Sequence, residues 1–346
     1  MKNKFNNHII TWYTQYGRKN LPWQSNNAYY VWVSEIMLQQ TQVIKVIDYF
    51  NLFTKKFPTL DALATASSED VLSSWSGLGY YNRARNLHKT AQICQQEHAG
   101  KLPKDMNQLV ALPGIGRTTA GAILSLASDL PFPILDGNVK RVMSRAFAIK
   151  NEKISQLNKE LWQLVERLMP QQRCREYNQA LMDLGSLVCT RTNPHCEKCP
   201  VSSMCIAKKN NQIELYPQAN KKTKQIKKTY HLLMIVNEKQ ILLEQRGSQG
   251  IWPELWFLPV YNNAKEIETV QIFDADKKSK SFEFNIQHIL THRKLDLQVH
   301  CYQNQTIIDQ YLTKNYKWVD LSNFQKLPHP TALKKIIQYF LAHEDC

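Results

Sequence analysis

The stretch CTRTNPHCEKCPVSSMC, residues 189–205, contains four cysteines within 17 residues, separated by six, two and five residues. Cysteine is a rare residue, so this density is far above chance. Four thiolates this close in sequence are typical of a tetrahedral zinc site or of an iron–sulfur cluster. Structural zinc sites usually contain two C-x2-C pairs, and only one such pair is present here. The four cysteines are Cys189, Cys196, Cys199 and Cys205.

The length and composition of the chain narrow the possible classes of protein. With 346 residues, the chain is long enough for two domains, and its 43% hydrophobic content predicts a folded protein. Lysine and arginine number 44 against 29 acidic residues, a net charge of +15. A balance this basic favours a polyanionic partner, either nucleic acid or an anionic membrane surface. No run of 18 apolar residues occurs, so we expect no membrane span.

The first ten residues, MKNKFNNHII, show no signal-peptide pattern. We therefore expect an intracellular protein, in which disulfides are rare. The cysteines outside the cluster have no partner pattern, and we interpret them as ordinary thiols. They are Cys94, Cys174, Cys301 and Cys346.

A change of pattern along the chain predicts two domains. Residues 1–210 show apolar positions at helical spacing, punctuated by prolines. The lysine-rich segment KKTKQIKK (221–228) lies in a predicted basic linker, 211–228. Residues 229–346 contain strand-like segments, including a hairpin around 237–239, and end in an amphipathic helix at 331–342. We expect a mainly α domain followed by an α+β domain.

The segment LPGIG (112–116) lies between two predicted helices, one ending near Ala111 and the next starting at Arg117. Gly114 and Gly116 allow a tight backbone turn. Free N–H groups at the start of the second helix would then form an anion site. An ordinary glycine-rich connection between helices has a similar sequence, so this segment alone does not establish phosphate binding.

Two carboxylates stand in largely apolar surroundings. Glu35 lies within a predicted helix, 29–43, and Asp136 follows the apolar stretch before NVKR. A buried glutamate has a raised pKa and can act as a general acid, while a carboxylate can stabilise or attack a sugar cation. The pair therefore suits N-glycosidic hydrolysis. The alternatives are a structural salt bridge for Glu35 and a helix N-cap for Asp136, and the cap is compatible with catalysis.

Six segments together resemble the adenine DNA glycosylases of the endonuclease III superfamily. The match is dense over residues 1–210 and looser over 229–346. The uneven cysteine spacing resembles the [4Fe–4S] loop of that superfamily. The segments are WYTQYGRKNLPW (12–23), VSEIMLQQTQV (33–43), GLGYYNRARNLH (77–88), LPGIGRTTAGAI (112–123), ILDGNVKR (134–141) and YNQALMDLGSLVCT (177–190).

The resemblance implies a fold, a substrate and a cofactor. We expect a helix–hairpin–helix motif at about 107–127 and one [4Fe–4S] cluster held by the loop 189–205. The expected substrate is duplex DNA containing adenine opposite 8-oxoguanine or guanine, and the expected product is an abasic site. We also expect a monomer that works in the bacterial cytoplasm at the nucleoid, away from membranes. Protein partners are not indicated by the sequence.

The resemblance also implies roles for individual residues. Glu35 would protonate adenine N7, Asp136 would stabilise or capture the sugar cation, and Asn138 would assist Asp136. Trp23 is equally well explained as a core residue. The resemblance implies that Gln40 and Tyr80 wedge into the DNA. It implies that Leu21, Trp23 and Gln179 line the adenine pocket.

One position separates this chain from the related endonuclease III lyases. Those enzymes resemble the chain in the cluster and the hairpin, but use a lysine just after the hairpin as a Schiff-base nucleophile. Thr118 occupies that place here, and a hydroxyl cannot form a Schiff base. We therefore expect hydrolysis without efficient strand cleavage. Lys140 is a possible source of slight lyase activity, and we interpret it as a phosphate contact.

The C-terminal half resembles the Nudix-like domain with which adenine DNA glycosylases recognise 8-oxoguanine. GIWPELWFLP (250–259) matches that domain, whereas the acidic helix of Nudix pyrophosphatases is missing from residues 264–280. We therefore expect recognition rather than hydrolysis. The family's Phe-Ser-His tip corresponds to Leu290-Thr291-His292, where the aromatic residue is lost. Thr291 and His292 are candidate lesion contacts, and an ordinary hairpin turn is the alternative.

Three other functions compete with this interpretation. A bifunctional lyase is opposed by Thr118 and by the additional C-terminal domain. A non-catalytic DNA-binding redox sensor would not need both Glu35 and Asp136. A Nudix nucleotide hydrolase would need the acidic helix that the sequence lacks.

Overall fold

The structure is a computed structural model that describes residues 2–218, 225–268, 280–303 and 315–343. The chain divides into two compact units. The first contains Met1–Ala66 and Asn82–Lys221, and the second contains Ser67–Tyr81 and Lys222–Cys346. The segment Ser67–Tyr81 therefore groups with the C-terminal residues, although it falls inside the expected helical domain 1–210.

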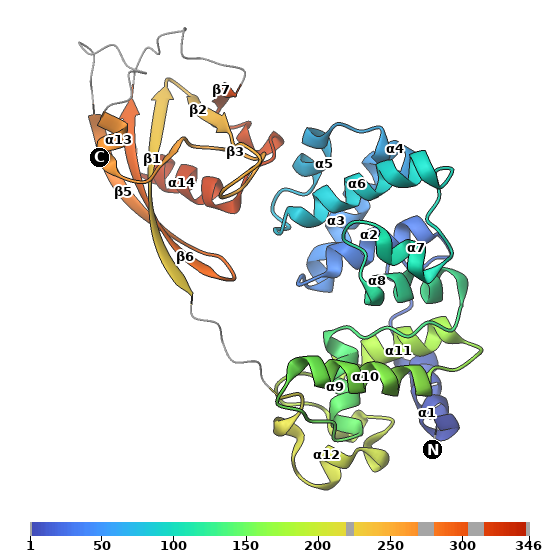
Figure 1. Ribbon diagram of the computed structural model, residues 1–346. Coiled ribbons are helices and arrows are strands. Elements are labelled where there is room, and N and C mark those ends of the chain that lie inside the picture. The colour runs from blue at the N-terminus through green and yellow to red at the C-terminus, as the bar shows by residue number, and fades with distance from the viewer. Residues whose placement is uncertain (1, 219–224, 269–279, 304–314, 344–346) are drawn as a thin grey trace. The chain divides into compact units, whose positions relative to one another are not determined.

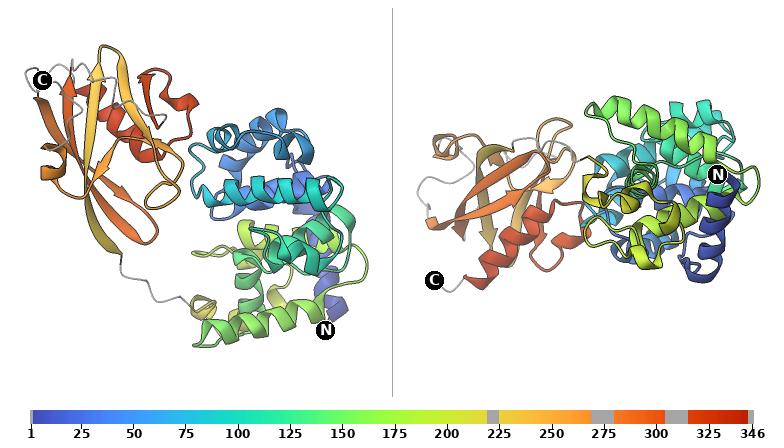
Figure 2. Two further views of the ribbon diagram at one scale, coloured as in Figure 1. Left: turned by 45° about the horizontal axis from the view of Figure 1, so that its top comes forward. Right: turned by 90° about the horizontal axis from the view of Figure 1, so that it is seen from below.

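The first unit is helical, as expected, and Figures 1 and 2 show helices throughout it. Helices α1 and α9 both pack against α11. Short 3-10 turns and α12 form the segment that carries the clustered cysteines. The helices are α1 (Lys2–Tyr16), α2 (Ala28–Leu38), α3 (Val43–Lys56), α4 (Leu60–Ala64), α6 (Asn82–Glu97), α7 (Met106–Ala111), α8 (Arg117–Ala122), α9 (Gly137–Ala146), α10 (Ile154–Leu168), α11 (Cys174–Leu187) and α12 (Ile206–Lys209).

Apolar side chains on one face of each helix form the core that holds α1, α9, α10 and α11 together. Phe5 and Ile9 of α1 meet Val142 of α9, Leu161 of α10 and Leu181 of α11 in this core. Each of these side chains is at most 2% exposed. The spacing of three and four residues within each helix is what places them on one face.

The predicted helix 29–43 is too long. Helix α2 ends at Leu38, and α3 begins separately at Val43. The buried guanidinium of Arg83 donates hydrogen bonds of 2.9 Å to the carbonyl oxygens of Ile36 and Met37, which occupies the last acceptors of α2. Gln40 follows with a φ of 59°, in the left-handed region. Arg83 is distant in sequence, so helical periodicity alone did not reveal this ending.

The predicted helix–hairpin–helix is present between α7 and α8. Gly114 has a φ of 78°, and a Cβ there would lie 2.8 Å from the Cβ of Asn86, so the turn requires glycine. Gly116 is the N-cap of α8 with an extended φ of −89°, so the left-handed residue of the turn is Gly114. The hydroxyl of Thr90 donates to the carbonyl oxygen of Pro113 at 2.8 Å and fixes the hairpin on α6.

The second unit is built on a seven-stranded mixed sheet with the order β3-β2-β1-β6-β5, in which β4 pairs with β1 and β7 with β2. The pair β1–β6 is parallel and the other pairs are antiparallel. The unit also contains α5 (Ser68–Ser74), α13 (Ala264–Glu268) and α14 (Thr331–Ala342). The strands are β1 (Ile226–Asn237), β2 (Gln240–Gln245), β3 (Trp256–Phe257), β4 (Val260–Tyr261), β5 (Lys280–Ile289), β6 (Arg293–Gln303) and β7 (Tyr316–Asp320).

Alternating side chains of β1 serve the two faces of this sheet. Leu232 and Met234 point into the core that α14 covers, while Leu233 and Ile235 point to the other face, where Ile267 of α13 packs. The C-terminal helix has the bounds that the sequence predicts, and the hairpin joining β1 to β2 is also present. Strand β1 starts inside the expected linker 211–228, part of which lies outside the described residues.

Candidate functional site

Glu35 of α2 lies within the electrostatic reach of Asp136. Burial raises the pKa of Glu35 from 4.5 to about 8, and the negative charge of Asp136 contributes to the same shift. Removal of a carboxyl group from water disfavours its charged form, and a neighbouring carboxylate disfavours it further. A pKa of about 8 favours the protonated form of Glu35 at neutral pH, although the residue as a whole is only partly buried.

Asp136 is the N-cap of α9. Its carboxylate accepts hydrogen bonds from the backbone N–H of Val139 at 2.7 Å and from the Nδ2 of Asn138 at 3.0 Å. Burial raises the pKa of Asp136, whereas these hydrogen bonds and the charge of Arg141 oppose the rise. The structural interpretation as a cap is confirmed. The donors around Asp136 favour its ionised form, in contrast to the surroundings of Glu35.

A hydrogen-bonded chain connects Asp136 to the cysteine loop. The NH2 group of Arg141 donates to the Oδ1 of Asn138 at 2.9 Å, and its Nε donates to the carbonyl oxygen of Cys189 at 2.7 Å. Asn138 in turn holds Asp136. Arg141 was not predicted from the sequence. Its place one helical turn after Asn138 was the available signal, since residues at i and i+3 share a helix face.

Gly185 is a second residue that was not predicted from the sequence. A Cβ at this position would lie 2.6 Å from the Cβ of Asn138, so α9 and α11 can approach this closely only with glycine between them. The carbonyl oxygen of Gly185 also accepts a hydrogen bond of 2.6 Å from Arg141. Nothing in the local sequence distinguishes this glycine from any other, because the contact joins two helices.

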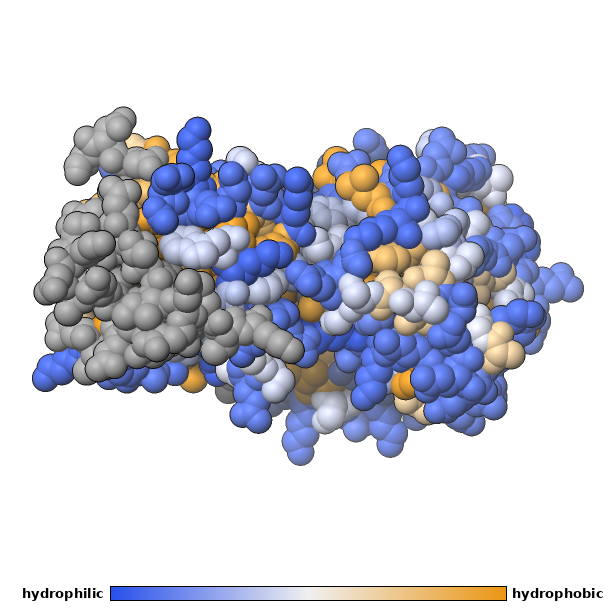
Figure 3. Space-filling view, turned by 90° about the horizontal axis from the view of Figure 1, so that it is seen from above, coloured by the Kyte–Doolittle hydropathy of each residue, from blue (hydrophilic) through white to orange (hydrophobic). Residues whose placement is uncertain are grey.

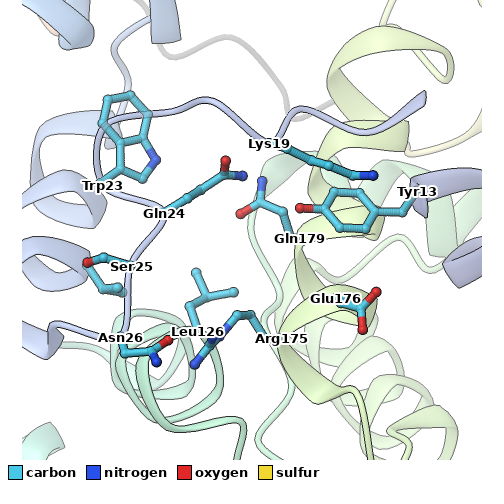
Figure 4. A pocket seen from close by; sticks show the side chains of 11 residues that line it. Tyr13, Lys19, Trp23, Gln24, Ser25, Asn26, Leu126, Arg175, Glu176 and Gln179 are labelled. Atoms are coloured by element: carbon cyan, nitrogen blue, oxygen red, sulfur yellow. The ribbon is translucent and has the colours of Figure 1, made fainter. Parts of the chain in front are cut away.

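A pocket of about 180 Å³ opens beside α11 (Figure 4). Two of the residues predicted for an adenine pocket, Trp23 and Gln179, line it. Trp23 is 5% exposed and packs edge-on against Phe50 with ring centroids 5.5 Å apart, so it is both a core and a pocket residue. Leu21 does not line this pocket, but its N–H donates to the Oε1 of Gln24 at 3.1 Å, and Gln24 does.

Gln179 is held at the pocket wall by Asp183, which forms an ion pair with the partly exposed Arg18. Its Nε2 donates to the Oδ1 of Asp183 at 3.0 Å. The same carboxylate accepts from the backbone N–H of Arg18 at 2.7 Å and from its Nε at 2.9 Å. The Asp183 side chain has no solvent exposure. Neither Arg18 nor Asp183 was predicted from the sequence. The two residues are 165 positions apart, so no local pattern indicates that they form a pair.

Thr118, where we expected the lysine of endonuclease III lyases to be replaced, forms a hydrogen bond within the first unit. The Thr118 hydroxyl donates to the carbonyl oxygen of Leu135 at 3.3 Å, directly before Asp136. This contact ties α8 to the segment that carries Asp136. Lys140 is half-buried on α9, and its backbone N–H donates to the carbonyl oxygen of Asp136 at 2.9 Å.

The predicted DNA-wedge and lesion residues lie at exposed turns. Gln40 follows α2 in the first unit. Tyr80, in the second unit, has a φ of 54°, and its hydroxyl is 3.1 Å from the Oγ1 of Thr291. Thr291 and His292 form the exposed turn between β5 and β6. Two of the four residues, Tyr80 and Thr291, are thus brought into contact.

The four clustered cysteines line one small cavity and form no disulfide. The guanidinium of Arg145 lies beside them, 4% exposed, and its NH1 is 3.4 Å from the Sγ of Cys189. Arg145 also donates to the carbonyl oxygens of Thr190 and Tyr216. The positive charge of this buried arginine would stabilise several negatively charged thiolates in the loop.

The chain is similar to known DNA repair proteins over most of its length. Residues 33–167 match the family model of the HhH-GPD superfamily base excision DNA repair proteins, and residues 231–339 match the NUDIX domain. The adenine DNA glycosylase of Buchnera aphidicola subsp. Acyrthosiphon pisum is 38% identical, with 97% of each chain covered. The adenine DNA glycosylase of Rattus norvegicus is 32% identical, with 98% of this chain and 78% of the rat protein covered.

The fold is also found in solved structures. A thermostable thymine-DNA glycosylase is similar with a TM-score of 0.56 and 27% identity, over 60% of this chain and 97% of that one. Because the similarity to adenine DNA glycosylases runs through both halves of the sequence, it includes the segments that carry the carboxylates and the pocket. The chain therefore belongs to the adenine DNA glycosylases, base-excision-repair enzymes that act on DNA and hydrolyse N-glycosyl bonds.

Proposed function

We propose that this glycosylase removes adenine paired with 8-oxoguanine or guanine and that Glu35 is its general acid. The observation that carries the proposal is the raised pKa of Glu35, about 8, beside Asp136. A carboxyl group with this pKa is protonated at neutral pH and is close to the ideal strength for proton transfer. Its nearest alternative, a structural salt bridge, has no support among the described residues, because the structure shows no cation paired with Glu35 there.

The two carboxylates divide the reaction between them. Glu35 donates its proton to N7 of the leaving adenine, which weakens the bond between the base and the sugar. Asp136, held by Asn138 and the start of α9, stabilises the oxocarbenium-like sugar or captures it. Asn138 acts as the helper that fixes the carboxylate of Asp136. The reaction leaves an abasic site.

The hydrolysis is proposed to proceed without efficient strand cleavage. The position of the lyase nucleophile is filled by Thr118, whose hydroxyl is bonded to the Leu135 carbonyl. Schiff-base formation needs an amine, which this side chain lacks. We assign Lys140 to a phosphate contact, and slight lyase activity would have to come from it.

We propose duplex DNA with an A:8-oxoguanine or A:G mispair as the partner of a monomeric enzyme. Gly116 is the N-cap of α8, and backbone N–H groups at the start of a helix suit a phosphate. We assign Gly114 and Gly116 to this contact. Among the residues drawn in colour in Figure 3, most are hydrophilic, and the chain carries a net charge of +15. We assign Gln40 and Tyr80 to wedge into the DNA helix at the place that the flipped adenine leaves. Across the described residues, no helix is long and apolar enough to cross a bilayer.

We assign residues 1–210 to catalysis and the Nudix-like residues 229–346 to lesion recognition. Thr291 and His292, at an exposed turn, are the proposed contacts to 8-oxoguanine. The threonine keeps a hydroxyl, whereas Leu290 cannot stack as phenylalanine does. Most of the segment 264–280, from which the acidic Nudix helix is missing in sequence, lies outside the described residues, as does part of the linker 211–228.

We propose one [4Fe–4S] cluster as the cofactor, held by Cys189, Cys196, Cys199 and Cys205. All four thiols line the same cavity. Their spacing of six, two and five residues contains a single C-x2-C pair, whereas structural zinc sites usually contain two. The buried guanidinium of Arg145, with its NH1 3.4 Å from the Sγ of Cys189, would offset the charge of the thiolates that hold a cluster.

The experiment that tests the proposed substrate is single-turnover base release from four matched duplexes. These duplexes carry one adenine opposite 8-oxoguanine, guanine, cytosine or thymine. We expect fast release opposite 8-oxoguanine, slower release opposite guanine and almost none opposite thymine. Equal rates for all four duplexes would show that the enzyme does not recognise the base opposite adenine. Tight binding without release would instead favour a non-catalytic sensor.

A further inference from the structure

We propose that Asp183 is a positioning residue that sets the base specificity of the pocket through Gln179. It holds the Gln179 amide so that the carbonyl oxygen, rather than the NH2 group, is presented to the base. The carbonyl oxygen of Gln179 then accepts a hydrogen bond from the 6-amino group of adenine. A purine with an oxygen at C6 offers no donor there and binds less well. This inference rests on the proposed function.

The chemistry of Asp183 leaves the amide one orientation. An ionised carboxylate can only accept hydrogen bonds, and a guanidinium cannot lose its charge in a protein. The Oδ1 and Oδ2 of Asp183 accept from the Nε and the backbone N–H of Arg18, so this carboxylate is matched by a permanent cation. The group of Gln179 that faces Asp183 must be a donor, which is its Nε2, at 3.0 Å. Rotation of the amide would place two acceptors against each other.

The free end of the amide belongs to the pocket. Gln179 is 7% exposed and lines the pocket, so its remaining polar atom, Oε1, is the one available to a bound base. Figure 4 shows this side chain extending from α11 toward Gln24 on the opposite wall. Adenine carries an amino group at C6, whereas hypoxanthine carries a carbonyl oxygen there. A shielded acceptor facing that oxygen would stay unpaired, which costs about tenfold or more in rate.

The same carboxylate also fixes the facing wall. The carbonyl oxygen of Arg18 accepts from the Nε2 of Gln24 at 2.7 Å and from the hydroxyl of Tyr13 at 3.2 Å. The NH2 of Arg18 donates to the Oγ of Ser186, at 2.9 Å. Asp183 therefore joins the loop that carries Gln24 to α11, which carries Gln179. Because both walls of the pocket are fixed in this way, the Gln179 amide needs no rearrangement when the base binds.

The test compares Asp183→Asn with the wild type on three duplexes, with adenine, hypoxanthine or unsubstituted purine opposite 8-oxoguanine. The measured quantity is the single-turnover rate at saturating enzyme. Asparagine keeps one acceptor oxygen where the carboxylate has two, so its NH2 group must face either the Arg18 backbone N–H or the donors of Arg18 and Gln179. Either placement removes a contact that holds the Gln179 amide in its orientation. We expect the adenine rate to fall about tenfold more than the purine rate, and the preference for adenine over hypoxanthine to fall. Purine has no group at C6 for Gln179 to contact.

Gln179→Met and the double variant complete a thermodynamic cycle. Methionine keeps the approximate shape of glutamine and removes its polar end, so we expect the same loss of adenine-over-purine preference. In the Gln179→Met background, Asp183→Asn should change that preference no further, because it acts through Gln179. Asp61→Asn, an exposed carboxylate change on α4 outside the pocket, is the matched control and should leave all rates unchanged.

The outcomes separate this inference from the proposed function. If Asp183→Asn slows adenine and purine equally, or still lowers the preference without Gln179, Asp183 is only structural and the inference fails. If Asp183→Asn does not fold, an unchanged adenine-over-purine preference in Gln179→Met overturns the inference equally well. If the wild type releases no adenine, the proposed function itself fails.

Discussion

Glu35→Gln should abolish excision and at the same time stabilise the folded protein. The folded protein holds a proton on Glu35 that the unfolded chain releases above pH 4.5, because the folded pKa is about 8. The stability that depends on this proton is complete below pH 4.5 and is lost as the pH rises toward 8. Glutamine resembles the protonated acid in shape and charge, so it does not suffer this loss.

The pKa values set the size of the effect. Each pH unit between 4.5 and 8 corresponds to about 1.4 kcal/mol. The variant should therefore be more stable than the wild type by about 1 kcal/mol at pH 5, about 3 kcal/mol at pH 7 and about 5 kcal/mol at pH 9. For a unit of this size, the pH 7 difference corresponds to roughly 10 °C in melting temperature.

The assay is thermal unfolding of both proteins at these three pH values and one scan rate, beside single-turnover excision at pH 7. Asp61→Asn serves as the control for replacing an exposed carboxylate by an amide, and its stability difference should not grow with pH. Duplex binding by Glu35→Gln should survive. A stability difference between Glu35→Gln and the wild type that is constant with pH, or excision at the wild-type rate, would refute the assignment of a buried, protonated acid.

Three further predictions concern the cysteine loop and the DNA. Arg141→Met should lower the excision rate about tenfold or more while duplex binding persists, since it removes the donor that holds Asn138; unchanged rates would show that Asp136 needs no such support. Cys199→Ser should lose the brown absorbance near 400 nm and lower the melting temperature; iron content equal to the wild type would exclude Cys199 as a ligand. Duplex affinity should fall steeply with salt because phosphate contacts release counterions, and a flat response would contradict a basic binding face.

The sequence predicted best those features that are encoded over short distances. The hairpin at Gly114 and the closing helix at 331–342 each lie within one segment, so glycine and apolar spacing were sufficient. The raised pKa of Glu35 was also predictable, because a single carboxylate within a largely apolar segment indicates such a shift. The spacing of the four cysteines is likewise local, and it is sufficient to indicate a metal site.

Features that depend on contacts between distant segments were missed. Helix α2 ends at Leu38 because Arg83 of another helix takes its carbonyl groups, and periodicity extended the helix too far. Gln179 was predicted, but not the buried Asp183 that orients it, since Arg18 is the partner that makes such a burial possible. A pattern in one segment cannot reveal a partner that tertiary folding supplies.

The most direct test of the central claim is the product formed from one duplex with adenine opposite 8-oxoguanine, analysed with and without alkali. We predict that free adenine appears in a single turnover and that the strand breaks only after alkali treatment. This result is expected for hydrolysis by Glu35 and Asp136, with Thr118 in place of the lyase nucleophile. Strand breakage without alkali would contradict the account and point to Lys140 as an amine nucleophile, and the absence of free adenine would contradict it outright.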